Sequence, residues 1–316
     1  MTAPATTNRI DESSAGPIRA EREAAAMAAA HDWRAMSARL ASMPPAAEDR
    51  SAMTTKLGDA AAKDDRWLWD WLAHEPANTS ALAVQLNYVV SVAWAVRTAA
   101  QADQVNHEQR QTFARTLRNA KIILARATAA DPSDPAPLIA MQSAAMGLGW
   151  TNDEYRELLG KIRERAPYSF TSHQRAMRYF LPRWFGSLET VERYVEGVLA
   201  GAPPGSVLTA LRLEMLYLEF RPKDEAGRTR FYRGARFNQA LDAGIADAAA
   251  ADPAHPKLPY LRHWLAHGLW QSGRLAEGAV QFRALGNYCG ADPWNWYGDQ
   301  TGTFREARDA CYAAAG

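Results

Sequence analysis

Cysteine and net charge are what this sequence has least of. Only two of the 316 residues are cysteines, Cys289 and Cys311, which is too few for a disulfide framework. We interpret both as buried thiols of a reducing compartment. The 36 basic and 35 acidic residues leave a formal charge of +1, so no global field draws the protein to nucleic acid or to an anionic membrane. Partners of those kinds would need a local patch.

Long hydrophobic runs are also missing. The most apolar helical stretch, residues 86–100, is shorter than the ~20 residues that a membrane span needs, and it includes Arg97. Residues 1–16 are small and polar without an apolar core. We therefore expect them to form a disordered leader and not a secretory signal. From these absences we expect a cytoplasmic protein of bacterial type with no membrane partner.

The familiar catalytic motifs are absent as well. The chain contains no Gly-x-Ser-x-Gly, no phosphate-binding glycine loop, no dinucleotide fingerprint and no paired-cysteine metal spacing. We therefore predict no catalytic residue, no cofactor and no metal site, and we expect a protein that is not an enzyme.

What the chain does contain is a repeat of helical-hairpin length. Pro132, Pro167 and Pro203 follow one another at steps of 35 and 36 residues, with Gly149 and Gly186 at matching points between them. No strand pattern lies inside the repeat. The spacing predicts an all-α fold, a tetratricopeptide-like right-handed superhelix of stacked antiparallel helical hairpins, because such hairpins bury their apolar faces only against neighbours.

The composition divides the chain into three parts. After the leader at residues 1–16, we expect an N-terminal helical arm over 17–55 and a repeat domain over 56–316. An alanine-rich run over residues 18–40 predicts one helix of the arm. At the start of the repeat domain, Trp67, Leu68, Trp71 and Leu72 form one apolar helical stripe, and Trp69 lies off it.

Serine, threonine and acidic residues predict where several helices begin. A hydroxyl residue followed three positions later by Glu or Gln is typical of a capping box, in which each side chain bonds the other residue's backbone N–H. The sequence places such boxes at Thr151 with Glu154, Thr171 with Gln174, and Thr303 with Glu306.

Residues 175–187 and 270–286, with 294–304 after them, carry a resemblance to a known family. They resemble a bacterial domain-of-unknown-function family whose members look tetratricopeptide-like and typically read Pro-Arg/Lys-Trp-Gly-Gly-Ser. This chain has Phe185 in place of the first glycine. The resemblance covers roughly residues 64–315. It implies an all-helical repeat domain and a general role in protein interaction, and it carries no known reaction.

The function that we expect is a non-catalytic protein–protein interaction module, a scaffold or adaptor that binds a peptide or partner helix in its concave groove. Arg175, Arg178 and Arg183 lie around the apolar stripe of one predicted helix and would orient carboxylates of the partner. Trp294 and Trp296 occupy a short segment between helices and would anchor apolar side chains, as tryptophan often does in interfaces.

A helical metal-dependent enzyme is one alternative. Asp64, Asp65 and Asp70 resemble the aspartate-rich motif of helical terpene cyclases, although no second magnesium-binding motif follows. His263 and His267 are spaced i, i+4, as in metalloprotease helices, but the glutamate that would act as general base is missing between them. Aspartates that open a helix, and ordinary core or surface histidines, are the simpler interpretations of these residues.

A helical repeat that binds nucleic acid is the other alternative. Its basic patch would consist of Arg221, Lys223, Arg228, Arg230, Arg233 and Arg236. Phe231, Tyr232 and Phe237 are interleaved with these cations and could stack bases. Because the total charge is neutral, we prefer a solvated hairpin edge or a contact for an acidic protein segment.

Overall fold

The chain is helical throughout the part that the structure describes. The structure is a computed structural model and describes residues 9–98 and 107–316. These residues form sixteen α-helices and no strand, with one isolated parallel bridge between Asp11 and Tyr288. The prediction of an all-α protein is confirmed. The chain divides into two compact units, unit 1 with residues up to 18 and 191–316, and unit 2 with residues 19–190.

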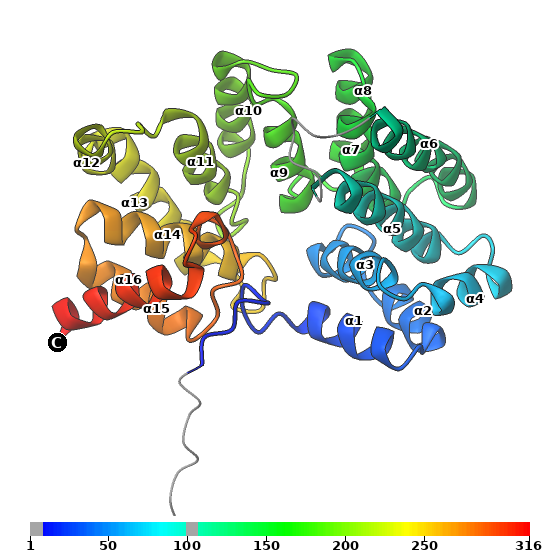
Figure 1. The fold of residues 1–316 in the computed structure, drawn as a ribbon, viewed down its shortest axis with the longest axis horizontal. Helices are drawn as coiled ribbons and strands as arrows, with labels where there is room; N and C mark the ends of the chain where they lie inside the picture. The colour runs from blue at the N-terminus through cyan, green and yellow to red at the C-terminus, as the bar shows by residue number, and fades with distance from the viewer. Residues whose placement is uncertain (1–8, 99–106) are drawn as a thin grey trace, which may run out of the picture. The chain divides into compact units, whose positions relative to one another are not determined.

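Unit 2 contains the first nine helices, labelled in Figure 1. They are α1 (Arg19–Ala29), α2 (Trp33–Ala41), α3 (Glu48–Ala61), α4 (Arg66–His74), α5 (Thr79–Thr98), α6 (His107–Ala130), α7 (Ala136–Leu148), α8 (Asn152–Arg165) and α9 (Phe170–Tyr179). Helix α10 (Leu188–Ala200) crosses the division at Val191.

Unit 1 contains the remaining helices. They are α11 (Thr209–Met215), a π-helix η1 (Leu216–Phe220), α12 (Glu225–Arg233), α13 (Ala235–Ala250), α14 (Leu258–Ser272), α15 (Leu275–Leu285), a short 3-10 helix η2 (Trp294–Trp296) and α16 (Gln300–Ala315). The boundaries expected after residues 16 and 55 do not coincide with the division into units, because residues 19–55 pack within unit 2.

The alanine-rich run forms two helices, so the prediction of one helix over residues 18–40 is wrong. His31 has a positive φ of 53°, which interrupts the helix. The Asp32 side chain then accepts a hydrogen bond from the backbone N–H of Ala35 at 3.0 Å and caps the start of α2. A local polar cap outweighs the high helix propensity of the alanines here.

The apolar stripe of α4 is confirmed. Trp67, Leu68, Trp71 and Leu72 are all buried, whereas Trp69 keeps 45% of its surface exposed. Burial of two indoles and two leucines supplies several kcal/mol of hydrophobic stabilisation at about 25 cal/mol per Å². The stripe therefore holds α4 in unit 2 by packing.

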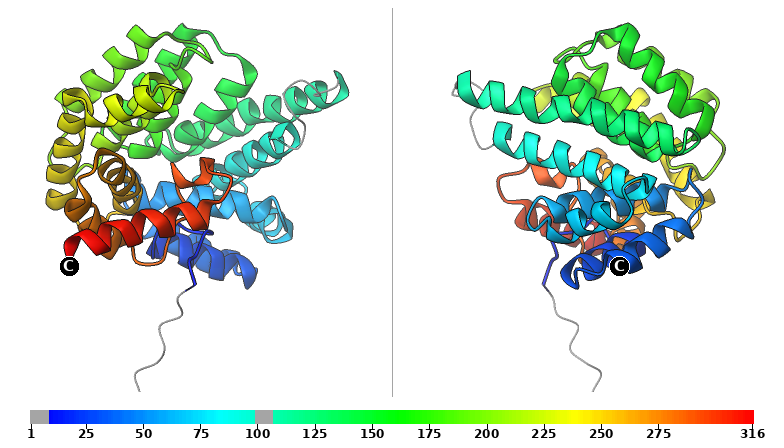
Figure 2. Two further views of the ribbon diagram at one scale, coloured as in Figure 1. Left: turned by 60° about the vertical axis from the view of Figure 1, so that its left-hand side comes forward. Right: turned by 90° about the vertical axis from the view of Figure 1, so that its right-hand side faces the viewer.

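Helices α5 and α6 pair along their length, and α5 also packs against α3 and α7 (Figures 1 and 2). A buried ion pair fixes the starts of α5 and α7. The Arg50 guanidinium lies 2.5 Å from an Asp134 carboxylate oxygen and donates to Ser80 Oγ at 3.0 Å and to the Leu40 carbonyl at 2.7 Å. One arginine thus joins four segments of unit 2.

The three predicted capping boxes have different outcomes. Thr151 and Glu154 form the box at the start of α8, as predicted. The cap of α9 is Ser169, and the Thr171 hydroxyl bonds to Glu48 instead. The cap of α16 is Asp299 and not Thr303.

In unit 1 the N-terminal segment packs against the C-terminal helices. The backbone N–H of Asp11 donates to Asn287 O at 2.7 Å, and the N–H of Cys289 donates to Asp11 O at 2.8 Å. Ile10 joins a buried cluster with Cys289 and Cys311, which are both free and buried as predicted. Residues 9–16 are therefore ordered here, in contrast to the leader expected over 1–16, of which residues 1–8 lie outside the described part.

None of the helices in the described ranges combines the length and the hydropathy that a membrane span requires.

Candidate functional site

The candidate site lies in unit 2 beside a tight turn at residues 181–187. The ring of Phe185 stacks on Tyr179 with centroids 4.7 Å apart, and the Phe185 carbonyl accepts a hydrogen bond from Asn152 Nδ2 at 3.1 Å. A Cβ atom on Gly186 would stand 2.0 Å from the carbonyl oxygen of Phe180. The turn therefore requires glycine at this position, and it holds the preceding side chains in place.

Those preceding side chains, Arg183 and Trp184, open onto a cavity of about 540 Å³. Its walls come from α5, from α7 and from the end of α9 with the turn. The lining residues are Val90, Trp94, Ser143, Met146, Arg178, Arg183 and Trp184. A volume of this size is within the range of ligand pockets, which is roughly 300–1,000 Å³.

Aromatic contacts set the orientation of the two indoles in the cavity wall. The ring of Trp94 lies edge-to-face against Trp184 at 6.0 Å and against Phe113 at 5.5 Å. Trp94 and Trp184 are each half-buried, so each shows part of its ring to the cavity. Arranged in this way, the indoles offer apolar surface at little entropic cost.

Two arginines bring positive charge to the same cavity. Arg178 is half-buried on α9, and Arg183 is exposed in the turn. Among the described residues that line the cavity, none is acidic. An arginine fork pairs well with carboxylates, so the cavity combines anion recognition with an apolar aromatic surface.

Arg175, predicted to join these arginines, has a different position. Its guanidinium donates to the backbone carbonyl of Ile139 at 2.6 Å, linking α9 to α7. Burial lowers the pKa of Arg175 from its ordinary value. Arg175 therefore supports the packing of unit 2, and it does not line the cavity.

The two tryptophans predicted as anchors also differ. Trp294 is fully buried and its Nε1 donates to His263 Nδ1 at 3.0 Å, so it has no surface for a partner. Trp296 keeps 42% of its surface exposed. The two tryptophans are two positions apart in a one-turn 3-10 helix, so their side chains leave the backbone in different directions. This explains why one ring is buried and the other is exposed.

His263 and His267 are both buried, and their ring nitrogens have separate partners. Because His263 Nδ1 accepts from Trp294, its Nε2 carries the proton and donates to the Ala15 carbonyl at 2.8 Å. His267 Nε2 lies 2.8 Å from the Tyr297 hydroxyl. Burial lowers the pKa of His263 to about 4 and that of His267 to about 3, so both rings are neutral at pH 7.

The three aspartates around the start of α4 also have separate roles. Asp64 pairs with Arg66 at 2.6 Å, and this hydrogen bond holds the pKa of Asp64 well below its usual range. Asp65 accepts from the Tyr88 hydroxyl at 3.0 Å, and Asp70 is exposed. Across residues 9–98 and 107–316, no group of three or more His, Cys, Asp or Glu side chains is arranged to hold a metal ion.

The basic patch lies on and around α12 in unit 1. Lys223, Arg230 and Arg233 are exposed, whereas Arg221 and Arg228 are half-buried. Of the three interleaved aromatic residues, two are buried, which leaves little ring area for stacking on bases.

Arg236 belongs to the same patch and has two partners within unit 1. It forms an ion pair with Glu192, and its guanidinium carbon lies 4.4 Å from the centre of the Phe220 ring. Part of the positive charge of the predicted patch is therefore paired with the protein's own side chains.

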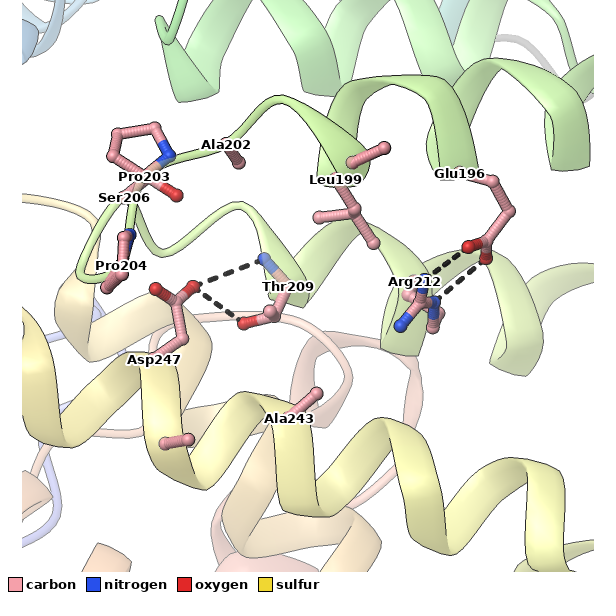
Figure 3. A pocket seen from close by; sticks show the side chains of 12 residues that line it. Glu196, Leu199, Ala202, Pro203, Pro204, Ser206, Thr209, Arg212, Ala243 and Asp247 are labelled. Carbon is pink, nitrogen blue, oxygen red and sulfur yellow. Dashed lines mark hydrogen bonds and ion pairs between the residues drawn. The ribbon is translucent and has the colours of Figure 1, made fainter.

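A second cavity, of about 480 Å³, lies in unit 1 between α10, α11 and α13 (Figure 3). Asp247 accepts hydrogen bonds from Gly205 N at 2.7 Å and from Thr209 Oγ1 at 2.8 Å, and Arg212 pairs with Glu196. The rest of the lining is alanine, proline, serine and leucine. The charged groups of this cavity therefore have partners in its own wall.

Sequence reasoning missed the contribution of α5 and α7 to the candidate site. Trp94 falls on an apolar face of α5, and Ser143 and Met146 lie in a helix that is apolar on nearly all sides. Such a pattern signals burial but not which residues border a cavity. Which residues of α5 and α7 border the cavity becomes clear only from the position of α9 and the turn after it.

Comparisons with protein-family models, with curated proteins and with solved structures found no match for this chain. The geometry of the site is therefore the basis for its interpretation.

Proposed function

We propose that this protein is a non-catalytic protein-interaction module that binds an acidic peptide segment in the cavity lined by Trp94, Arg178, Arg183 and Trp184. The observation that carries the proposal is the meeting of two arginines and two indoles around one cavity of about 540 Å³. The arginines would pair with carboxylates of the segment, and the indoles would receive one aromatic or large aliphatic side chain.

The proposal includes a tetratricopeptide-like arrangement of the hairpins. Helices α7 and α8 form one antiparallel pair, joined at Gly149 in the left-handed conformation with φ 67°. Contacts of α7 with α5, α6, α8 and α9 support stacking of neighbouring hairpins in unit 2. Arrays of this kind use the surface between successive helices to bind peptides.

Charge and polarity select the class of partner. The cavity contains two cations, and its neutral lining is mainly apolar. A basic peptide would be repelled by the two guanidinium groups, and a neutral polar peptide would gain no charge–charge attraction from them. An acidic segment with one bulky apolar residue satisfies both parts of the surface.

The test is selection of peptides from a random display library on the purified full chain, followed by affinity measurement with the selected peptide. We expect enrichment of Asp or Glu next to an aromatic or large aliphatic residue, with affinity that falls as salt rises. The double substitution R178A/R183A should weaken binding by about 10- to 100-fold, because both charged contacts are lost.

The matched control removes the same charge from α8 in the same unit. Arg156 and Arg163 are exposed there, and Arg156 pairs with Asp153 at the surface. The R156A/R163A protein should bind the selected peptide as the wild type does. Enrichment of peptides without acidic residues, or equal loss in both double variants, would refute the proposal.

A further inference from the structure

A second group of polar side chains gathers in unit 1 around Arg221, and the proposed function does not use it. Five residues from four segments make up this group, which we name the Arg221 cluster. They are Tyr217 of η1, Arg221 directly after it, Tyr232 of α12, His267 of α14 and Tyr297 after η2. The His267 ring lies 5.5–5.9 Å from the rings of all three tyrosines.

Arg221 is the charged member of the cluster. Its guanidinium carbon lies 4.3 Å from the centre of the Tyr217 ring, and it also hydrogen-bonds with Tyr232. Its Nε–H is buried and has no hydrogen-bond acceptor among the described residues. A buried donor without an acceptor is costly, so the cluster has one donor more than its own acceptors satisfy.

The hydroxyl groups form a chain that ends at Tyr217. His267 contacts the Tyr297 hydroxyl at 2.8 Å, and Tyr297 is hydrogen-bonded in turn to Tyr217. Tyr217, the last member of this chain, is also the ring against which the Arg221 guanidinium packs.

The surrounding charges favour an anion. Arg228 acts on both Tyr217 and Tyr297, and Asp292 acts on Tyr217. Two guanidinium groups and one carboxylate therefore contribute to the electrostatic potential at the tyrosines. Burial raises the pKa of all three tyrosines, so their hydroxyls stay protonated at neutral pH.

Next to these donors lies an exposed aromatic surface. Trp296 keeps 42% of its area exposed. Its ring centre is 5.2 Å from that of Tyr217 and 5.7 Å from that of Trp264, so the indole is held in place from one side. Trp296 thus adjoins Tyr217, the ring against which Arg221 packs.

We propose that the Arg221 cluster binds the carboxylate of a small aromatic acid, with Arg221 as the counter-ion, the Tyr217 hydroxyl as a second donor, and Trp296 as the surface on which the ring packs. The unit that carries this site is unit 1, so the inference is independent of the proposed peptide cavity in unit 2. A π-helix directly before Arg221 agrees with this role, because π-helical turns occur frequently at functional sites.

The test uses benzoate as the probe, with the neutral benzamide as its matched isostere. The full chain is labelled with 5-fluorotryptophan, and W296F assigns the Trp296 resonance in the fluorine spectrum. We expect benzoate to shift that resonance saturably, with a Kd of about 1 mM or tighter. Benzamide should leave it unchanged, because it lacks the charge that Arg221 neutralises.

Substitutions in the cluster locate the binding. R221K keeps the charge but loses the planar fork and should raise the Kd by about tenfold. R233K changes an exposed arginine of α12 in the same way and should leave the Kd unchanged. If R221K does not fold, Y217F supplies the same test, because it removes only the hydroxyl and should weaken benzoate about threefold or more.

Three results would overturn the proposal. One is no shift of Trp296 with benzoate up to about 10 mM. Another is a Kd that is the same in the wild type, R221K and Y217F. The third is an equal response to benzamide or to inorganic phosphate, which would exclude recognition of an aromatic carboxylate.

Discussion

Removal of the Asp134 carboxylate should destabilise unit 2 strongly. The Arg50 and Asp134 side chains are 6% and 2% exposed, and their charged atoms are 2.5 Å apart. With D134A, the Arg50 guanidinium stays buried without an anion. Breaking a buried pair in this way costs about 3–5 kcal/mol of unfolding free energy.

The structure divides that cost into two parts. Asp134 also accepts a hydrogen bond from the backbone N–H of Ala136, the first residue of α7, at 2.9 Å, which is worth about 1 kcal/mol. D134N keeps an acceptor for this hydrogen bond and loses the charge. Arg50 would retain the Leu40 carbonyl and Ser80 Oγ as acceptors. We therefore expect D134N to lose about 2–4 kcal/mol and D134A about 1 kcal/mol more.

The assay is urea denaturation of the full chain with hydrogen exchange of α5 and α7 as a local readout. R50M/D134L is the control, because it removes both charges and should be far closer to the wild type than either single variant. Since α5 and α7 both line the cavity that we propose to bind a peptide, D134A should also weaken that binding if the proposal holds. A cost below about 1 kcal/mol for D134A would refute the reasoning, as would a double variant less stable than both single variants.

Three further predictions concern stability and reactivity. G186A should destabilise the protein by about 1–3 kcal/mol, because its new Cβ would meet the Phe180 carbonyl. G160A, whose new Cβ would lie in open space on α8, should be neutral or stabilising by up to about 1 kcal/mol. Thermal melts in which G160A is the less stable variant would contradict this prediction. Burial lowers the pKa of His263 from 6.5 to about 4, so only the unfolded chain binds this proton between those pH values. His263 by itself should therefore lower the stability by about 1.4 kcal/mol per pH unit as pH decreases through that window, and His267 should add a similar slope. H263Q should show a smaller total slope in denaturation at several pH values. Burial raises the pKa of the Cys289 and Cys311 thiols to about 11, so a thiol reagent at pH 8 should react only after denaturation, and fast reaction of the native protein would show that they are accessible.

Helix positions were the most predictable feature of this protein. The range of α8, residues 152–165, follows from its apolar spacing and from the capping box at Thr151 and Glu154. The failed boxes show the limit of this signal. Ser169 and Asp299 lie a few residues before Thr171 and Thr303, and each can also cap a helix. Choosing between neighbouring caps depends on contacts such as that of Glu48 with Thr171, which come from distant parts of the chain.

The candidate sites were predictable only in part. Arg178 and Arg183 were singled out by sequence and do line a cavity, but Arg175, three residues from Arg178, bonds to the Ile139 carbonyl of α7 instead. Trp294 and Trp296 differ in the same way, one buried and one exposed. Helical spacing gives relative directions of side chains on one element, and it does not say which neighbour covers them.

By itself, the sequence determined the helical content and the burial of the α4 stripe, because these depend on local spacing and propensity. The tertiary structure alone decided that the N-terminal segment joins unit 1 and that side chains from η1, α12 and α14 meet around Arg221. Such contacts join residues far apart in the chain, so their formation depends on the packing of whole helices and leaves no short-range pattern to read.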